Sequence, residues 1–181
     1  MDQMDQMAGQ AVDFGFSHAK ALNPATLHVY TEVRDMCAAD RCGIYDHCWT
    51  CPPACGSLDE HRERLERYHS GIIVQTTGTL EDQFDFEGMQ DAGTRHQELF
   101  RSFAAELRPR FTDLLALGSG GCNLCESCTW PTQPCRHPEK AISSMEAYGL
   151  FVSEVCRDND IPYTYGSGTI TYIGCYLWNE E

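Results

Sequence analysis

Three cysteines in one short loop have a spacing that is typical of cluster ligands. Cys122, Cys125 and Cys128 follow one another at C-x2-C-x2-C spacing, directly after Gly120 and Gly121. Thiolates at this spacing can wrap one compact inorganic cluster and bind a different iron each, as in the cysteine run of bacterial ferredoxins. The loop therefore predicts an iron-sulfur site.

A fourth candidate ligand, Cys135, follows in the same segment. Six residues separate it from Cys128, and a proline precedes it. The ferredoxin run instead has about three intervening residues and a proline after the last cysteine. The spacing leaves open whether Cys135 closes the same cluster. A lone zinc ion suits the loop less well, because structural zinc sites usually draw two pairs of ligands from separated hairpins.

A second group of cysteines precedes this loop and is less regular. Five thiols lie between residues 37 and 55 at C-x4-C-x5-C-x2-C-x3-C spacing. Four of them could enclose one cluster, or three could hold it and leave one iron free for an external ligand. His47 and His137 stand beside cysteines, but histidines in such places serve more often as surface or hydrogen-bonding groups. The members of the group are Cys37, Cys42, Cys48, Cys51 and Cys55.

The two remaining cysteines have the pattern of core residues. Cys156 falls on the apolar face of an expected helix, and Cys175 alternates with Ile173 and Leu177. A free cysteine packs as a small hydrophobic residue. We therefore expect both thiols in the core, which leaves nine of the 11 cysteines as candidate ligands.

The composition indicates a folded domain in a reducing compartment. With 181 residues and 42% apolar side chains, the chain is long enough to bury a real core. It shows neither a secretory leader nor an apolar run of membrane-spanning length, so we expect a soluble, cytoplasmic protein. In that compartment, an odd and large number of cysteines indicates metal binding or catalysis more than disulfides.

The charge balance limits the classes of partner and of function. The chain has 27 acidic and 13 basic side chains, a formal net charge of -14. Such acidity disfavours nucleic acid and anionic membranes, so we expect neither as a partner. A redox protein is the partner that a cluster would suggest. Hydrolase and NAD-dehydrogenase functions have no supporting motif, because no serine-histidine-acid order, nucleotide fingerprint or zinc-protease helix is present.

Helices and strands that alternate along the chain must position these loops. Ser57 and Glu60 form a capping-box start, and His96 falls on an apolar helical stripe, where we expect a core histidine. A helix that begins at Pro138 would direct its N-terminus toward the cysteines, where its dipole would favour an anionic cluster. Helices are expected over residues 8–16, 58–69, 92–109 and 138–155, strands over 72–74, 114–117 and 169–178, and a loop over 81–91.

The expected fold class is α/β or α+β. Its centre is a mixed sheet of about four to five strands flanked by helices, with the two cysteine-rich metal loops gathered at one end. Residues 1–7 repeat Met-Asp-Gln and are expected to be a flexible N-terminal tail. Residues 8–181 are expected to form a single metal-binding domain.

Several separated elements together resemble a known family. The chain is similar, over nearly all of its length after the tail, to the prokaryotic cysteine-rich family of predicted metal-binding proteins of unknown function. The resemblance implies a metal or iron-sulfur protein of an anaerobe-leaning prokaryote, without an established reaction. The elements are Cys37, Cys42, Tyr45, Cys51 with Pro52 and Pro53, and the segments 84–87, 121–128 and 134–141.

The resemblance also implies which cysteines are ligands. Cys48 looks like an addition of this chain, and Cys55 occupies a position that the family pattern leaves variable. If neither is a ligand, the first site has three thiolates, and a cubane held there would expose one iron as a Lewis acid. The family pattern falls on Cys37, Cys42 and Cys51 in the first group and on Cys122, Cys125, Cys128 and Cys135 in the second.

The expected function is that of a soluble iron-sulfur protein with one or two 4Fe-4S clusters. It would act in electron transfer or, through the three-cysteine open site, in redox or lyase chemistry. Whether it is an enzyme stays open; if so, it would be an iron-sulfur oxidoreductase or lyase. The alternatives are a zinc-stabilised interaction module and a carrier of a metal or cluster. Side chains that could position a substrate, each with an ordinary surface or packing role as the simpler expectation, are Arg34, Tyr45, Asp85 and Glu87.

Overall fold

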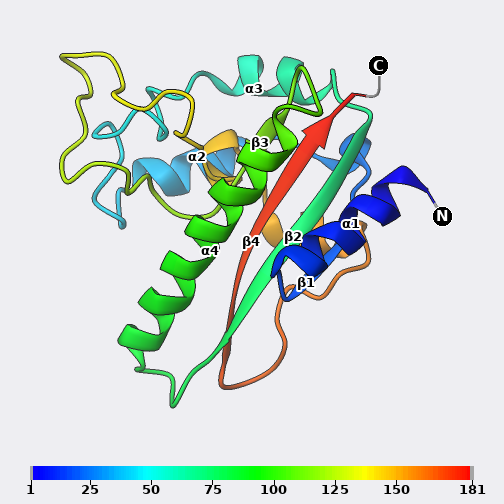
Figure 1. Cartoon of the computed structure of the whole chain (residues 1–181). Coiled ribbons are helices and arrows are strands. Elements are labelled where there is room, and N and C mark those ends of the chain that lie inside the picture. Colours follow the sequence, from blue (N-terminus) through cyan, green and yellow to red (C-terminus); the bar gives the residue numbers. More distant parts are fainter. Residues whose placement is uncertain (1, 180–181) are drawn as a thin grey trace.

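The centre of the protein is a four-stranded antiparallel sheet in the order β1-β2-β4-β3 (Figure 1). The computed structural model describes residues 2–179, so residues 1, 180 and 181 lie outside the described part. The strands are β1 (His18–Ala21), β2 (Ser70–Thr79), β3 (Leu115–Leu117) and β4 (Thr169–Trp178). The helices are α1 (Gln3–Phe14), α2 (Thr31–Ala38), α3 (Leu58–Leu65), α4 (Phe86–Leu107) and α5 (Val152–Asp158), with 3-10 turns η1 (Pro24–Thr26) and η2 (Glu146–Tyr148).

The two long strands β2 and β4 form the frame of the sheet. They pair along their whole length, from Ser70 opposite Trp178 to Thr79 opposite Thr169. Successive side chains of a strand point to opposite faces. Accordingly, Ile72 belongs to one buried apolar cluster and its neighbour Ile73 to another. Both faces of the sheet are therefore covered.

Different segments cover the two faces. Met7 of α1 and Phe103 of α4 pack in the cluster that contains Ile72. Figure 1 shows α1 and α4 crossing the same face of the sheet. On the other face, Met145, directly before η2, and Val155 of α5 pack with Ile73. The sheet is thus the middle of three layers.

The strand directions explain how α4 is placed. β2 and β3 each pair antiparallel with β4, so they run in the same direction with β4 between them. The chain crosses from β2 to β3 through α4, which makes a split β-α-β unit. The expectation of a sheet of four to five strands flanked by helices is confirmed. Its neighbouring strands are all antiparallel, so β2 shares a direction with β3, and β1 with β4, only across an intervening strand.

Three local expectations are confirmed closely. The Ser57 hydroxyl accepts from the Glu60 backbone N–H at 3.2 Å, and the Glu60 carboxylate accepts from the Ser57 N–H at 2.7 Å, so the capping box is formed. α4 ends at Leu107, two residues before Pro109, which cannot continue a helix. β4 covers the whole of the expected strand.

The helix expected over residues 138–155 is wrong. Residues 143–145 instead pair with Gly118, whose N–H donates to the Ser143 carbonyl at 2.9 Å and whose carbonyl accepts from the Met145 N–H at 3.0 Å. Gly149 then ends η2 with a φ of 84°, a left-handed conformation that a helix interior does not allow. Only α5 is helical further on. No helix N-terminus at Pro138 therefore faces the cysteines, and the expected dipole contribution does not exist.

Two boundaries nearer the N-terminus also differ from expectation. Residues 3–7, expected to be a tail, are the first turns of α1, because Met7 reaches the core and is 1% exposed. The expected loop over 81–91 gives way to α4 at Phe86, because the Asp85 carboxylate accepts from the Gly88 N–H at 2.8 Å and caps the helix. β1 was not expected.

Among the described residues, no helix has both the length and the apolar character needed to cross a membrane.

Candidate metal centre

Two cysteine loops lie side by side at one end of the sheet (Figure 1). We call residues 37–57, which run from the end of α2 to the start of α3, the first cysteine loop. Residues 118–145, between β3 and η2, are the second cysteine loop. The Trp49 indole N–H donates to the Gln133 carbonyl at 3.1 Å, and the Trp130 N–H donates to the Asp46 carboxylate at 3.0 Å. Each loop therefore holds the other through a tryptophan.

A glycine allows a second close contact between the loops. The end of the Ile44 side chain occupies the space that a side chain on Gly121 would need. Its neighbour Gly120 has a φ of 73°, which side-chain-bearing residues rarely adopt. The two glycines thus let the second loop turn tightly against the first.

One cavity gathers the cysteines of the second loop. Its volume is about 160 Å³. A single water needs roughly 10–15 Å³ of such space, so the cavity can hold a considerably larger body. His47 and His137 also line it, and the His47 Nδ1–H donates to the Tyr45 carbonyl at 2.6 Å. Five thiols line this cavity, those of Cys48, Cys122, Cys125, Cys128 and Cys135.

A second cavity gathers three cysteines of the first loop. Cys37, Cys42 and Cys51 line a space of about 190 Å³, together with Tyr45 and Glu146. These are the three positions that the resemblance assigned to the first site. Cys55 does not line this cavity. We call this space the first-loop cavity and the other the second-loop cavity.

The two cavities share a wall. Ile44 lines both of them. Within the wall, hydrogen bonds from the Cys122 and Cys51 thiols lower the pKa of Cys48. The same contacts, together with burial, raise the pKa of Cys51 and of Cys122. Cys48 thus touches one cysteine of each cavity.

Two thiols at the back of the first loop lie against η2. The Cys37 and Cys55 thiols donate to the carbonyls of Glu146 and Ala147, at 3.9 and 3.7 Å. Burial raises the pKa of Cys37 and raises that of Cys55 to about 11. The nearby Arg34 opposes both shifts, since a positive charge favours a thiolate.

The candidate substrate-positioning residues fall in different places. Arg34 donates to the carbonyls of Gly56 and Ala147, at 3.1 and 3.2 Å, and so ties the first loop to η2. Tyr45 lines the first-loop cavity. Asp85 caps α4, and neither Asp85 nor Glu87 lines either cavity.

The thiols are distributed around the cavity walls. Within residues 2–179, no three His, Cys, Asp or Glu side chains converge closely enough to hold a single metal ion. All 11 cysteines are free thiols. Cys156 and Cys175 are 0% exposed, as expected of core residues.

Two features of the site were not expected from the sequence. Cys48 was expected only as a possible further ligand, yet it lines the second-loop cavity and contacts one cysteine of each cavity. The tryptophan contacts between the loops were also missed. Their signal in the sequence is a tryptophan close behind a cysteine in each loop, Trp49 after Cys48 and Trp130 after Cys128.

The comparisons with known proteins concern nearly the whole of this architecture. A family model described as "Predicted metal-binding protein (DUF2284)" matches residues 20–178, which include both cysteine loops. No curated protein and no solved structure gives a significant match.

Proposed function

Because the chain belongs to this family of predicted metal-binding proteins, we propose that its two cysteine loops hold iron-sulfur clusters. The second-loop cavity would hold a 4Fe-4S cluster through Cys122, Cys125, Cys128 and Cys135. The first-loop cavity would hold a second one through Cys37, Cys42 and Cys51. When bound, such clusters supply one-electron transfer, and an iron without a fourth protein ligand supplies Lewis acidity.

One observation carries this proposal: five thiols surround a single cavity in the second loop. Cluster iron is bound by thiolates, and a cluster spreads its ligands over several irons instead of one. A cavity of about 160 Å³ that five cysteines line has the donor chemistry and the space for such a body. The C-x2-C-x2-C spacing supports the same assignment.

The protein's own residues would prepare the site in three ways. Hydrogen bonds with Cys122 and Cys51 lower the pKa of Cys48, so that a thiolate at the shared wall would be available as a further metal ligand beside both proposed sites. Trp49 and Trp130 tie the loops together and limit their opening. Arg34 places a positive charge near Cys37 and Cys55, which favours an anionic group in that region.

The adjacency of the cavities favours electron transfer as the function. Ile44 lines both, and Cys48 contacts Cys51 of one and Cys122 of the other. Two redox centres on either side of one side-chain layer would exchange electrons readily. A substrate would instead need the open position of the first site, which Tyr45 and Glu146 also line.

The test uses anaerobic reconstitution of the protein with iron and sulfide, followed by visible absorption and electron paramagnetic resonance. We expect two distinguishable reduced-cluster signals. Cys125→Ser should remove or alter one of them, and Cys42→Ser the other. The matched control is Cys156→Ala, a buried cysteine outside both cavities, which should leave both signals in place.

Two outcomes would redirect the proposal. Zinc bound in place of iron, without any sulfide, would support a zinc-stabilised module instead. Transfer of the cluster to an apo-ferredoxin within minutes would support a carrier. A single signal that neither Cys42→Ser nor Cys125→Ser changes would contradict both ligand assignments.

A further inference from the structure

A groove with three basic side chains runs beside the second cysteine loop. Arg101 of α4, Arg108 directly after the end of α4 and Lys140 of the loop line a hollow of about 350 Å³. Leu124 and Ile142 give it an apolar lining. Pockets for small molecules have volumes of roughly 300–1,000 Å³ and combine an apolar lining with a few polar groups. The groove therefore has the size and composition of a ligand site.

Among residues 2–179 the three cations have no acidic partner within ion-pair distance, although the chain has a net charge of -14. No carboxylate lines the groove. Arg101 donates to the Asn123 side-chain carbonyl at 2.8 Å, which is a neutral partner. Three like charges thus meet in one hollow without a counter-charge, and an anion from solution would supply it. The ion pairs within residues 2–179 involve other basic residues, namely Lys20, Arg62, Arg64 and Arg157.

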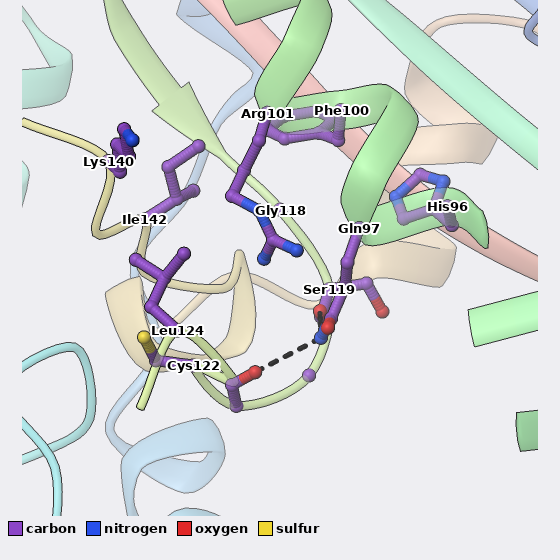
Figure 2. Close-up of a pocket in the computed structure, with 12 residues that line it drawn as sticks. His96, Gln97, Phe100, Arg101, Gly118, Ser119, Cys122, Leu124, Lys140 and Ile142 are labelled. Atoms are coloured by element: carbon purple, nitrogen blue, oxygen red, sulfur yellow. Dashed lines mark hydrogen bonds between the residues drawn. The ribbon is translucent and has the colours of Figure 1, made fainter. Parts of the chain in front are cut away.

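An inner pocket continues the groove toward the sheet. Figure 2 shows Arg101 of α4 and Leu124 and Ile142 of the second cysteine loop around it, and His96 at its edge. The pocket has a volume of about 20 Å³, enough for about one water or one ligand atom. The His96 Nδ1 is hydrogen-bonded to the Thr76 hydroxyl at 2.8 Å. Its Nε2 is buried and has no partner among the described residues, so the pocket contains a polar atom without its hydrogen bond.

We propose that this groove binds a small organic anion with a carboxylate or phosphate group. Arg101 and Arg108 are seven residues apart, about two helical turns, so they lie on the same face of α4. An arginine can bind a carboxylate or phosphate through two parallel hydrogen bonds, and Lys140 adds a point charge. The apolar part of the ligand would pack against Leu124 and Ile142.

The proposed anion site lies next to the candidate metal centre. Asn123, the partner of Arg101, stands next to Cys122 in the chain. Gly120 and Gly121 line both the inner pocket and the first-loop cavity. The inner pocket, which continues the groove, is therefore separated from that cavity by the Gly120 and Gly121 backbone. The proposal goes beyond the iron-sulfur assignment and holds for any metal in the loops.

The test is isothermal titration calorimetry on the full chain, purified anaerobically, with glutarate and with inorganic phosphate. Glutaramide, the neutral analogue of glutarate, controls for apolar binding. Arg108→Gln and Lys140→Gln each remove one charge from the groove. Arg95→Gln removes an equal charge from the same helix, at an exposed position that does not line the groove. Metal content is measured in every sample, so a lost metal and a lost anion site are distinguished.

We expect saturable binding of at least one anion and none of glutaramide. Arg108→Gln and Lys140→Gln should each weaken binding about tenfold or more, the scale of a lost charged hydrogen bond. Arg95→Gln should change it less than about twofold, since exposed charges at a distance are screened. If Arg108→Gln lowers the melting temperature of the protein, the comparison rests on Lys140→Gln, which changes an exposed residue of the loop. Absence of binding by both anions, or an equal loss in Arg95→Gln, overturns the proposal.

Discussion

The ring of Trp49 stands edge-on to the ring of Trp130, with centroids 4.7 Å apart and planes at 83° to each other. One tryptophan belongs to the first cysteine loop and the other to the second. Edge-to-face aromatic pairs contribute about 0.5–1.5 kcal/mol beyond the area they bury. The pair therefore joins two loops that are otherwise long and irregular.

Removal of this ring contact should loosen the metal site more than the fold. Trp130→Leu loses both the ring contact and the hydrogen bond to Asp46. We expect metal to leave to a chelator about fivefold faster, as a loss of about 1 kcal/mol implies. The measurement is the rate of metal release under excess chelator. Tyr163→Leu, which changes an exposed aromatic residue outside both cavities, is the control. An unchanged rate in Trp130→Leu would show that the pair does not hold the loops.

Two glycine substitutions should separate loop effects from core effects. In Gly174→Ala the new methyl group would meet the Leu117 carbonyl at 2.8 Å and the Phe100 ring at 2.5 Å. Such overpacking typically destabilises by about 1–3 kcal/mol. In Gly121→Ala the methyl meets only the end of the Ile44 side chain, which can move. We expect a clear drop of the urea midpoint for Gly174→Ala and little for Gly121→Ala. Equal drops would mean that the loop contact is as rigid as the core.

Substitution of Cys48 should alter the clusters in both cavities, and substitution of Cys55 should alter them less. Cys48 contacts Cys51 and Cys122, whereas Cys55 lines neither cavity. In Cys48→Ser we expect both resonance signals of the reconstituted protein to shift. In Cys55→Ser, the matched control, the second-loop signal should stay unchanged. If Cys48→Ser left both signals as they are, Cys48 would have no role at the shared wall.

The stability of the fold should fall in mild acid through His96. Burial lowers the pKa of His96 to about 4, against 6.5 in the unfolded chain. At a pH between these values, the unfolded chain binds a proton at His96 that the folded chain does not bind. The stabilisation that depends on a neutral His96 is therefore complete above about pH 6.5 and is lost as the pH falls toward 4. The loss can reach about 3 kcal/mol. Urea unfolding of the wild type and of His96→Phe at pH 7, 5.5 and 4.5 measures it.

The variant provides the internal comparison. His96→Phe cannot titrate, and its ring can pack among the aromatic neighbours Phe16 and Phe100. Metal loss in acid affects both proteins, so the difference between them isolates the histidine. Parallel pH profiles for the two proteins would show that His96 does not control the acid response.

Much of the sheet could be predicted because its strands follow the alternation rule. β4 is a long run whose residues alternate across a buried sheet, and the capping box at Ser57 is a local signal with a local cause. The helix expected at 138–155 was wrong because apolar spacing carries no information about long-range backbone pairing. Residues 143–145 pair with Gly118, and that contact joins residues far apart in the sequence.

The site was predictable in its members but not in its arrangement. Cysteine spacing groups Cys122, Cys125 and Cys128 in one loop, and the structure gathers them around one cavity. Nothing local indicates that Cys48 of the first loop joins them there. The basic groove likewise needs α4 and the loop together, although the seven-residue spacing of Arg101 and Arg108 was a visible sign.

The central claim is that the cysteine-lined cavities hold iron and inorganic sulfide. Its most direct test is the count of iron, acid-labile sulfide and zinc per chain in protein purified without oxygen. We expect about four irons and four sulfides for one occupied cavity, or about eight of each for two, and no stoichiometric zinc. One or two zinc ions without sulfide, in a well-folded protein, would contradict the account.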